Sequence, residues 1–161
     1  EAGIAKVGVM VHVPAAALRA KDVFSVADFV SIGTNDLAQY TMAADRLLGD
    51  LVDLLDPWQP AVLELVAAVS WASGEAAKPA GVCGESASDP LMALVLTGLG
   101  ITSLSMSPAA VPGVRFALSR HTLAECEAIA AAARGGRTAA DSRGAALELC
   151  DPEVREVLAL G

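Results

Sequence analysis

Four groups of polar or reactive side chains lie where apolar runs of this sequence end. They are His12, residues 33–36 (Gly-Thr-Asn-Asp), residues 83–85 (Cys-Gly-Glu) and residues 105–107 (Ser-Met-Ser). A carboxylate in such a turn can hold a hard cation, and an Asn beside a Gly-Thr backbone can donate hydrogen bonds to an anion. A cysteine beside glycine has room to approach a ligand or donate a proton. Together these residue types predict one ligand site.

Each group also has an ordinary structural interpretation. The 33–36 turn could be a helix cap, because Asn and Asp bond to their neighbouring backbone. Cys83 could be a small buried hydrophobic residue, and His12 could be a core or turn histidine. Arg46 follows Asp45 and could form a surface ion pair. The residue types alone leave both interpretations open.

The elements that must position these groups follow an alternating pattern. Short apolar runs alternate with helical patterns, which predicts βα units around a parallel sheet. The strands are expected at residues 6–13, 28–32, 79–84 and 101–106. Reactive side chains in such folds collect at the carboxyl ends of the strands, so the four groups should meet on one face. Four βα units are half of a (β/α)₈ barrel, which takes about 250 residues, and this chain is too short for all of it.

The C-terminal part has a different pattern. Residues 122–134 predict a helix, with Glu125 early and Arg134 late, as the helix dipole favours. Residues 134–144 are polar and glycine-rich, which is typical of a linker. We therefore expect a half-barrel domain at 1–133, a flexible linker at 134–144 and a helical tail at 145–161.

Composition narrows the class of protein. The 161 residues carry 11 basic and 19 acidic side chains, for a net charge of −8. Such a surface repels nucleic acid and anionic membranes, and no apolar run approaches the roughly 18–20 residues of a membrane span. Three irregularly spaced cysteines suit a reducing compartment, which predicts a cytoplasmic protein. Cys126 and Cys150 lie on helical patterns and are expected to pack, and His121 is expected at a helix start or on the surface.

Residues 28–46 (DFVSIGTNDLAQYTMAADR) resemble the long signature of the phosphoenolpyruvate-utilising enzymes. Residues 81–90 (GVCGESASDP) resemble the cysteine loop of that family, and residues 9–14 (VMVHVP) resemble the strand before both motifs. Residues 39–41 (QYT) and 104–108 (LSMSP) are most similar to enzyme I of the phosphoenolpyruvate-dependent sugar phosphotransferase system. Pyruvate phosphate dikinase and phosphoenolpyruvate synthase are more distant. The resemblance spans roughly residues 7–133.

The resemblance implies a (β/α)₈ barrel that binds phosphoenolpyruvate and Mg²⁺, or Mn²⁺ in its place, and that forms a homodimer. Asp36 then corresponds to the metal-binding aspartate, and Asn35 to the asparagine that contacts the phosphate. Arg46 corresponds to the arginine that holds the phosphoryl group. Cys83 corresponds to the acid that protonates the enolate carbon to give pyruvate. In the family the phosphoryl group passes to a phosphohistidine domain and then to a phosphocarrier protein, neither of which is expected on this chain.

One site residue departs from the family. His12 stands where the family has a second metal-binding glutamate. Mg²⁺ prefers oxygen ligands and imidazole suits softer metals, so we expect weaker Mg²⁺ binding or a different metal. The first four βα units are also expected outside this chain, so the isolated chain should be an inactive part of a phosphoenolpyruvate-protein phosphotransferase. Two alternatives are a non-catalytic dimerisation or interaction module, and a dikinase-like or synthase-like domain.

Overall fold

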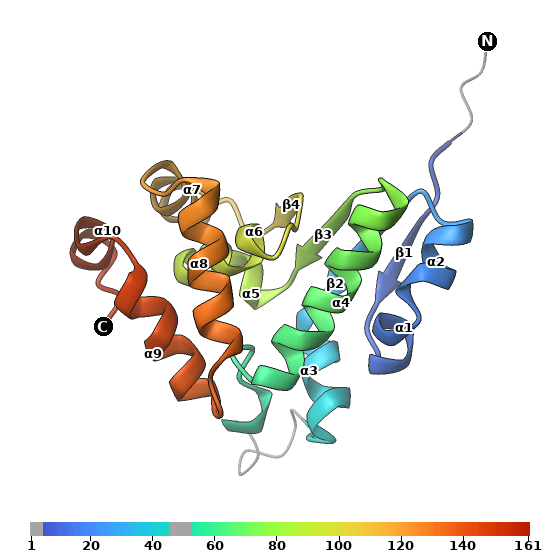
Figure 1. Cartoon of the computed structure of the whole chain (residues 1–161), viewed down its shortest axis with the longest axis horizontal. Helices are drawn as coiled ribbons and strands as arrows, with labels where there is room; N and C mark the ends of the chain where they lie inside the picture. The colour runs from blue at the N-terminus through green and yellow to red at the C-terminus, as the bar shows by residue number, and fades with distance from the viewer. Residues whose placement is uncertain (1–4, 46–52) are drawn as a thin grey trace.

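The computed structural model describes residues 5–45 and 53–161, which contain a four-stranded parallel sheet (Figure 1). The strands are β1 (Gly8–Val11), β2 (Phe29–Gly33), β3 (Ala80–Cys83) and β4 (Ser103–Ser105). They lie side by side in chain order, and every neighbouring pair is parallel. This confirms the predicted α/β class and places a strand within or next to each of the four predicted runs.

Helices connect and follow the strands. In the described part of the chain they are α1 (Pro14–Leu18), α2 (Ala20–Val26), α3 (Thr34–Met42), α4 (Pro60–Ala76), α5 (Glu85–Ser88), α6 (Pro90–Gly98), α7 (Val111–Ser119), α8 (Leu123–Arg134), α9 (Ala139–Leu149) and α10 (Pro152–Val157). Proline occupies the first turn of α1, α4, α6, α7 and α10. A first-turn N–H has no partner within its helix, so the missing donor costs little there and the fixed φ favours the start.

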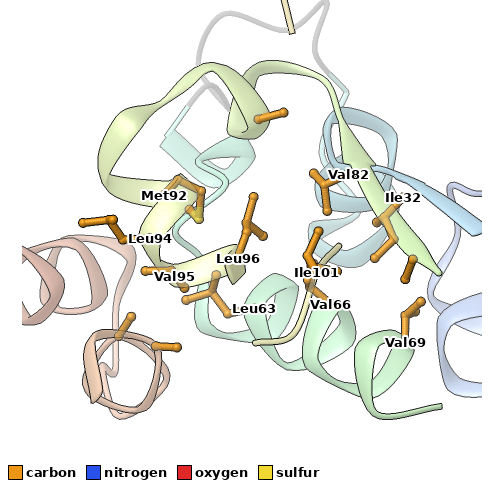
Figure 2. Packing of buried hydrophobic residues seen from close by; sticks show 14 of the residues in the cluster. Ile32, Leu63, Val66, Val69, Val82, Met92, Leu94, Val95, Leu96 and Ile101 are labelled. Atoms are coloured by element: carbon orange, nitrogen blue, oxygen red, sulfur yellow. The ribbon is translucent and has the colours of Figure 1, made fainter. Parts of the chain in front are cut away.

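One face of the sheet is packed against helices. Ile32 and Val82 are fully buried register partners on β2 and β3. Figure 2 shows them on the side of the sheet where Leu63, Val66 and Val69 of α4 lie. Side chains alternate between the two faces of a strand, so every second strand residue enters this core. The Val-rich runs of the sequence therefore form the covered face.

The opposite face of the sheet is exposed. Met10 of β1 and Phe29 of β2 are 46% and 39% exposed, and Ser103 and Ser105 of β4 are exposed as well. The register places these residues on the same face as Gly33 and Cys83, the last residues of β2 and β3. The sheet thus has one buried hydrophobic face and one exposed face on which small, polar and large apolar side chains are mixed.

The helical C-terminal part differs from the sequence expectation. Residues 139–144 fall in the predicted flexible linker, but they form the first half of α9. The Thr138 hydroxyl accepts a hydrogen bond from the Asp141 N–H at 3.1 Å, which caps the helix. Ser142 and Ala146 of α9 are fully buried, and α9 packs on α8 (Figure 1). The division into domain and tail remains a prediction.

The residues assigned to packing behave as expected. Cys126 and Cys150 are both buried, and burial raises the pKa of each thiol. His121 follows α7 and joins it to α10, because one ring nitrogen lies 2.8 Å from the Ala117 carbonyl and the other accepts from the Asp151 N–H at 3.0 Å. Across the described residues, every helix is too short or too polar to cross a membrane.

Candidate ligand site at the carboxyl ends of the strands

The turn between β2 and α3 places two polar side chains in the first turn of a helix. β2 ends at Gly33 and α3 begins at Thr34, so Asn35 and Asp36 stand at the helix N-terminus. The Thr34 hydroxyl donates to the Cys83 carbonyl at 3.2 Å, which ties the end of β2 to the end of β3. First-turn N–H groups and the helix dipole favour a bound anion at such a position.

The turn after β3 fixes the side chain of Asn35. The Glu85 N–H donates to Asn35 Oδ1 at 3.2 Å. Gly84, which directly precedes Glu85, has φ +99°. A Cβ on Gly84 would lie 2.8 Å from Asn35 Oδ1. Only glycine therefore fits this approach. Because the oxygen of Asn35 accepts this hydrogen bond, its NH₂ group is the part of the side chain that could donate to a ligand.

Cys83 stands beside this turn with its thiol half-buried. It is the last residue of β3 and the register partner of Gly33. Its Sγ–H donates to the Ile32 carbonyl at 3.5 Å. Ser105 is the next register partner along the same row and is exposed, so the predicted 105–107 group begins at the same edge of the sheet.

His12 and Asp36 face each other across this edge. His12 Nδ1 lies 2.7 Å from Asp36 Oδ2, with the two side chains 39% and 32% exposed. This is an ion-pair distance, and within the described residues Nδ1 is buried without a hydrogen-bond partner. The imidazole lies against Gly33, where a Cβ would be 2.7 Å from both Nδ1 and Cε1. Glycine at this position therefore leaves the space that the ring fills.

A small hollow of about 140 Å³ adjoins the first turn of α3. It is lined by Thr34, Asn35, Leu55, Pro57 and Glu85. Leu55 and Pro57 come from the segment before α4, and they carry no reactive group that sequence reasoning could have selected. The apolar wall that they form is a contribution visible only in the fold.

The structure brings four of the five predicted site residues to one edge of the sheet: His12, Asn35, Asp36 and Cys83. The fifth, Arg46, lies outside the described residues. Within residues 5–45 and 53–161, no three His, Cys, Asp or Glu side chains converge as a metal centre. Mg²⁺ keeps oxygen ligands, from one or two carboxylates, waters and phosphate, whereas imidazole suits softer metals, so the imidazole of His12 does not fit it.

Comparison with known proteins identifies the family. A family model described as "PEP-utilising enzyme, PEP-binding domain" matches residues 2–123. The chain belongs to the PEP-utilising enzymes. The resemblance drawn from residues 28–46 and 81–90 is thereby confirmed. The matched range contains the strand-end residues described above and ends where α8 begins.

Relatives of this PEP-utilising enzyme chain are much longer than the chain. It is 57% identical over 147 residues to the phosphoenolpyruvate-protein phosphotransferase of Streptomyces coelicolor, covering 91% of this chain and 26% of that protein. The protein of the same name from Latilactobacillus sakei is 46% identical over 115 residues, or 71% and 20%. The multiphosphoryl transfer protein of Rhodobacter capsulatus is 40% identical over 139 residues, or 86% and 17%. The chain therefore spans about a quarter of their length or less.

Proposed function

We propose that this chain is the C-terminal half of the phosphoenolpyruvate-binding barrel of a phosphoenolpyruvate-protein phosphotransferase similar to enzyme I. The observation that carries the proposal is the convergence of Asn35, Asp36 and Cys83 at the carboxyl edge of one parallel sheet, inside the range that matches the PEP-binding domain. The names of the relatives support a phosphotransferase over a dikinase or a synthase.

The strand order supports the half-barrel. Parallel strands that follow one another in chain order put their right-handed crossovers on the same face, whereas doubly wound sheets reverse the order and cover both faces. Here the order is β1-β2-β3-β4 and only one face forms the hydrophobic core. The exposed face that holds Met10 and Phe29 would then be the inside of the barrel, filled in part by side chains from the other four strands.

The phosphate of the ligand would bind at the first turn of α3. The backbone N–H groups there and the NH₂ group of Asn35 would donate to its oxygens. Arg46 would add a permanent positive charge that stabilises the phosphoryl group in transfer. The acceptor histidine and the phosphocarrier protein would belong to parts that this chain does not supply.

Cys83 would act after the phosphoryl group has left. Its S–H bond would break as a C–H bond forms at the terminal carbon of the enolate, giving pyruvate and a thiolate that must later be reprotonated. The half-buried thiol at the end of β3 supports this role, because part of the residue is reachable from solvent at the carboxyl edge of the sheet.

Family members generally use a divalent metal, but His12 and Asp36 do not fit the expected Mg²⁺ and we assign no step to it. In the proposed barrel the four strands described here would form half of the ligand site, so we expect no turnover from residues 1–161 alone. A homodimer in the cytoplasm completes the proposal, and the mass of the chain in solution tests the dimer.

Calorimetric titration of phosphoenolpyruvate into the full chain tests the proposed ligand. We expect saturable binding that weakens about tenfold, or 1.4 kcal/mol, in Asn35→Ala, and that is unchanged in Ser119→Ala on α7. Cys83→Ser should still bind the ligand, since the thiol would act on a later step. No binding at millimolar ligand by a folded chain would refute the proposal. It would favour the non-catalytic interaction module, whose surfaces would be the exposed sheet face and the edges of β1 and β4.

A further inference from the structure

The outer side of α4 has an unusual composition for a surface helix. Between Glu64 and Glu75 the helix carries no charged residue. Its side away from the core nevertheless meets solvent, because Gly74 is exposed and Trp71 is 61% exposed. Surface helices normally carry charged or polar side chains on the solvent side, and a helix without them is usually covered by another element. We therefore expect a partner on the outer side of α4.

Trp71 stands on a ridge between two hollows. Helix α4 lies between α2 and α8 (Figure 1). The larger hollow, of about 590 Å³, lies between α4 and the C-terminal ends of α6 and α8, and Gly74 and Arg134 are part of its lining. The smaller hollow, of about 290 Å³, lies toward α1 and α2, and Leu18, which is 70% exposed, is part of its lining. Trp71 lines both hollows, so a projecting ring and a space for a ring lie side by side.

The indole of Trp71 is held in position by a neighbouring cation. Lys21 Nζ lies 4.1 Å from the centroid of the ring and 4.0 Å from Glu75 Oε2. This cation–π contact covers one face of the ring and leaves the rest exposed. A side chain that is already held in place loses little conformational freedom when it enters a partner.

The charges along the ridge suit a second copy of this chain. The chain carries a net charge of −8, so two copies repel each other over most of their surface. Three of the basic side chains that line the two hollows pair with acidic ones: Arg19 with Asp22, Lys21 with Glu75, and Arg134 with Glu64. Lys78 adds one further positive charge to the larger hollow. The ridge is therefore close to neutral, and two copies can meet there with little repulsion.

We propose that the outer side of α4 is a self-association surface, on which Trp71 of each of two copies enters the larger hollow of the other. A two-fold axis brings one patch against the same patch of the second copy, so a patch with both a ring and a hollow is complementary to itself. Hollows of this size accept whole small molecules, so an indole fits. The proposed function includes a homodimer, and this inference rests on that part of it alone.

The fluorescence of Trp71 in the full chain tests the contact. The chain has two tryptophans, and Trp58 is buried, so Trp58→Phe leaves Trp71 as the only indole. We expect a dilution series followed by sedimentation to show a dimer that dissociates into monomers. The emission of Trp71 should shift to longer wavelength over the same concentrations, and acrylamide should quench it more strongly. A chain that is monomeric at every concentration, or a dimer whose Trp71 emission stays that of an exposed indole, would overturn the inference.

Three variants locate the surface. Trp71→Ser should raise the dissociation constant of the dimer by about tenfold or more, because buried aromatic residues dominate the energy of interfaces. Val157→Ser is the matched control, since Val157 on α10 is equally exposed at 61%, and it should leave the dissociation constant unchanged. Met10→Ser alters the open sheet face instead. A dimer that Met10→Ser dissociates and Trp71→Ser leaves intact would overturn the inference and assign the contact to the sheet face.

The outcome is separable from that of the ligand titration. Phosphoenolpyruvate binding by a monomeric chain, or by a dimer that does not depend on Trp71, would overturn this inference and leave the proposed ligand standing. A dimer that depends on Trp71 but does not bind phosphoenolpyruvate would do the reverse.

Discussion

The two faces of the sheet differ in what their side chains do, although they alternate along the same strands. On β2 the fully buried Ile32 precedes Gly33, and on β3 the fully buried Val82 precedes Cys83. The covered face carries branched aliphatic side chains, whereas the exposed face ends in glycine and cysteine at the ligand edge. Adjacent residues of the same strand thus serve the hydrophobic core on one face and the candidate ligand site on the other.

This difference has an energetic meaning. Complete burial of a side chain such as Ile32 stabilises the fold by about 1.5–3 kcal/mol. Gly33 and Gly84 bury no side chain and act through the space they leave, which His12 and Asn35 occupy. Substitutions on the covered face should therefore change the free energy of unfolding, and substitutions at the edge should mainly change ligand binding.

Ile32→Ala should give the largest effect. It removes three carbons from a site with no exposed surface, so we expect the free energy of unfolding to fall by about 2–5 kcal/mol. Urea denaturation followed by circular dichroism measures this. Ile32→Val, expected to cost about 0.5–1.5 kcal/mol, keeps the test readable if the alanine variant does not fold.

Ser31→Ala is the matched control on the opposite face of the same strand. Ser31 is half-buried, and we expect a change within about 0.5 kcal/mol. Equal losses for the two alanine variants would contradict the division into a core face and a ligand face.

The covered face could be predicted from the sequence because burial of a strand leaves a local pattern. The Val-rich runs predict strands, and the polar residues at their ends predict the edge where they meet, as the pairing of Gly33 with Cys83 confirms. The sequence places the first half of α9 in a linker, because the signal that starts this helix is small. Thr138 and Asp141 form a cap within a stretch whose glycines and charges are typical of a linker.

The contacts within the site could not be predicted in the same way. Asn35 and Glu85 meet only because Gly84 adopts a positive φ, and sequence does not report that angle. His12 and Asp36 are 24 positions apart, and their 2.7 Å contact depends on how β1 and α3 are placed by the sheet. Residue types indicated which side chains could act, but only the fold pairs them.

Gly84→Ala should give an intermediate loss of stability and a strong loss of binding. Its φ of +99° and ψ of −165° lie in a region that only glycine adopts readily, so alanine should cost about 1–3 kcal/mol. The new Cβ would also press on Asn35 Oδ1 and displace its amide. Urea denaturation and phosphoenolpyruvate titration measure the two effects separately.

Gly74→Ala is the control for adding a methyl group. Gly74 lies in α4, and a Cβ there would meet nothing within 4 Å. We expect this variant to be more stable by up to about 1 kcal/mol, because alanine favours a helix over glycine, with unchanged ligand binding. Normal binding by Gly84→Ala would mean that the Asn35 amide is not held by this turn.

Glu64→Gln should give the smallest effect, because the pair it breaks belongs to neither face of the sheet. Arg134 on α8 donates from two nitrogens to the two carboxylate oxygens of Glu64 on α4, at 2.7 and 2.8 Å. Both side chains are about half exposed (42% and 53%), so after allowance for solvent screening the pair contributes about 0.5 kcal/mol. Glu75→Gln, which loosens a 4.0 Å contact with Lys21, is the control and should change stability less.

The pH dependence of the difference in free energy of unfolding between the parent chain and Glu64→Gln shows whether the charge of Glu64 causes it. The hydrogen bonds from Arg134 lower the pKa of Glu64 below its usual 4.5. A carboxyl whose pKa is lower in the folded state stabilises the fold above the unfolded-state value, and the contribution is lost as pH falls through the folded-state pKa. The free energy of unfolding of the parent chain should therefore exceed that of Glu64→Gln by a constant amount from pH 7 to about 5. This excess should decline as the pH is lowered further. A difference of the same size at about pH 3 would mean that packing of the side chain between α4 and α8, rather than its charge, connects the two helices.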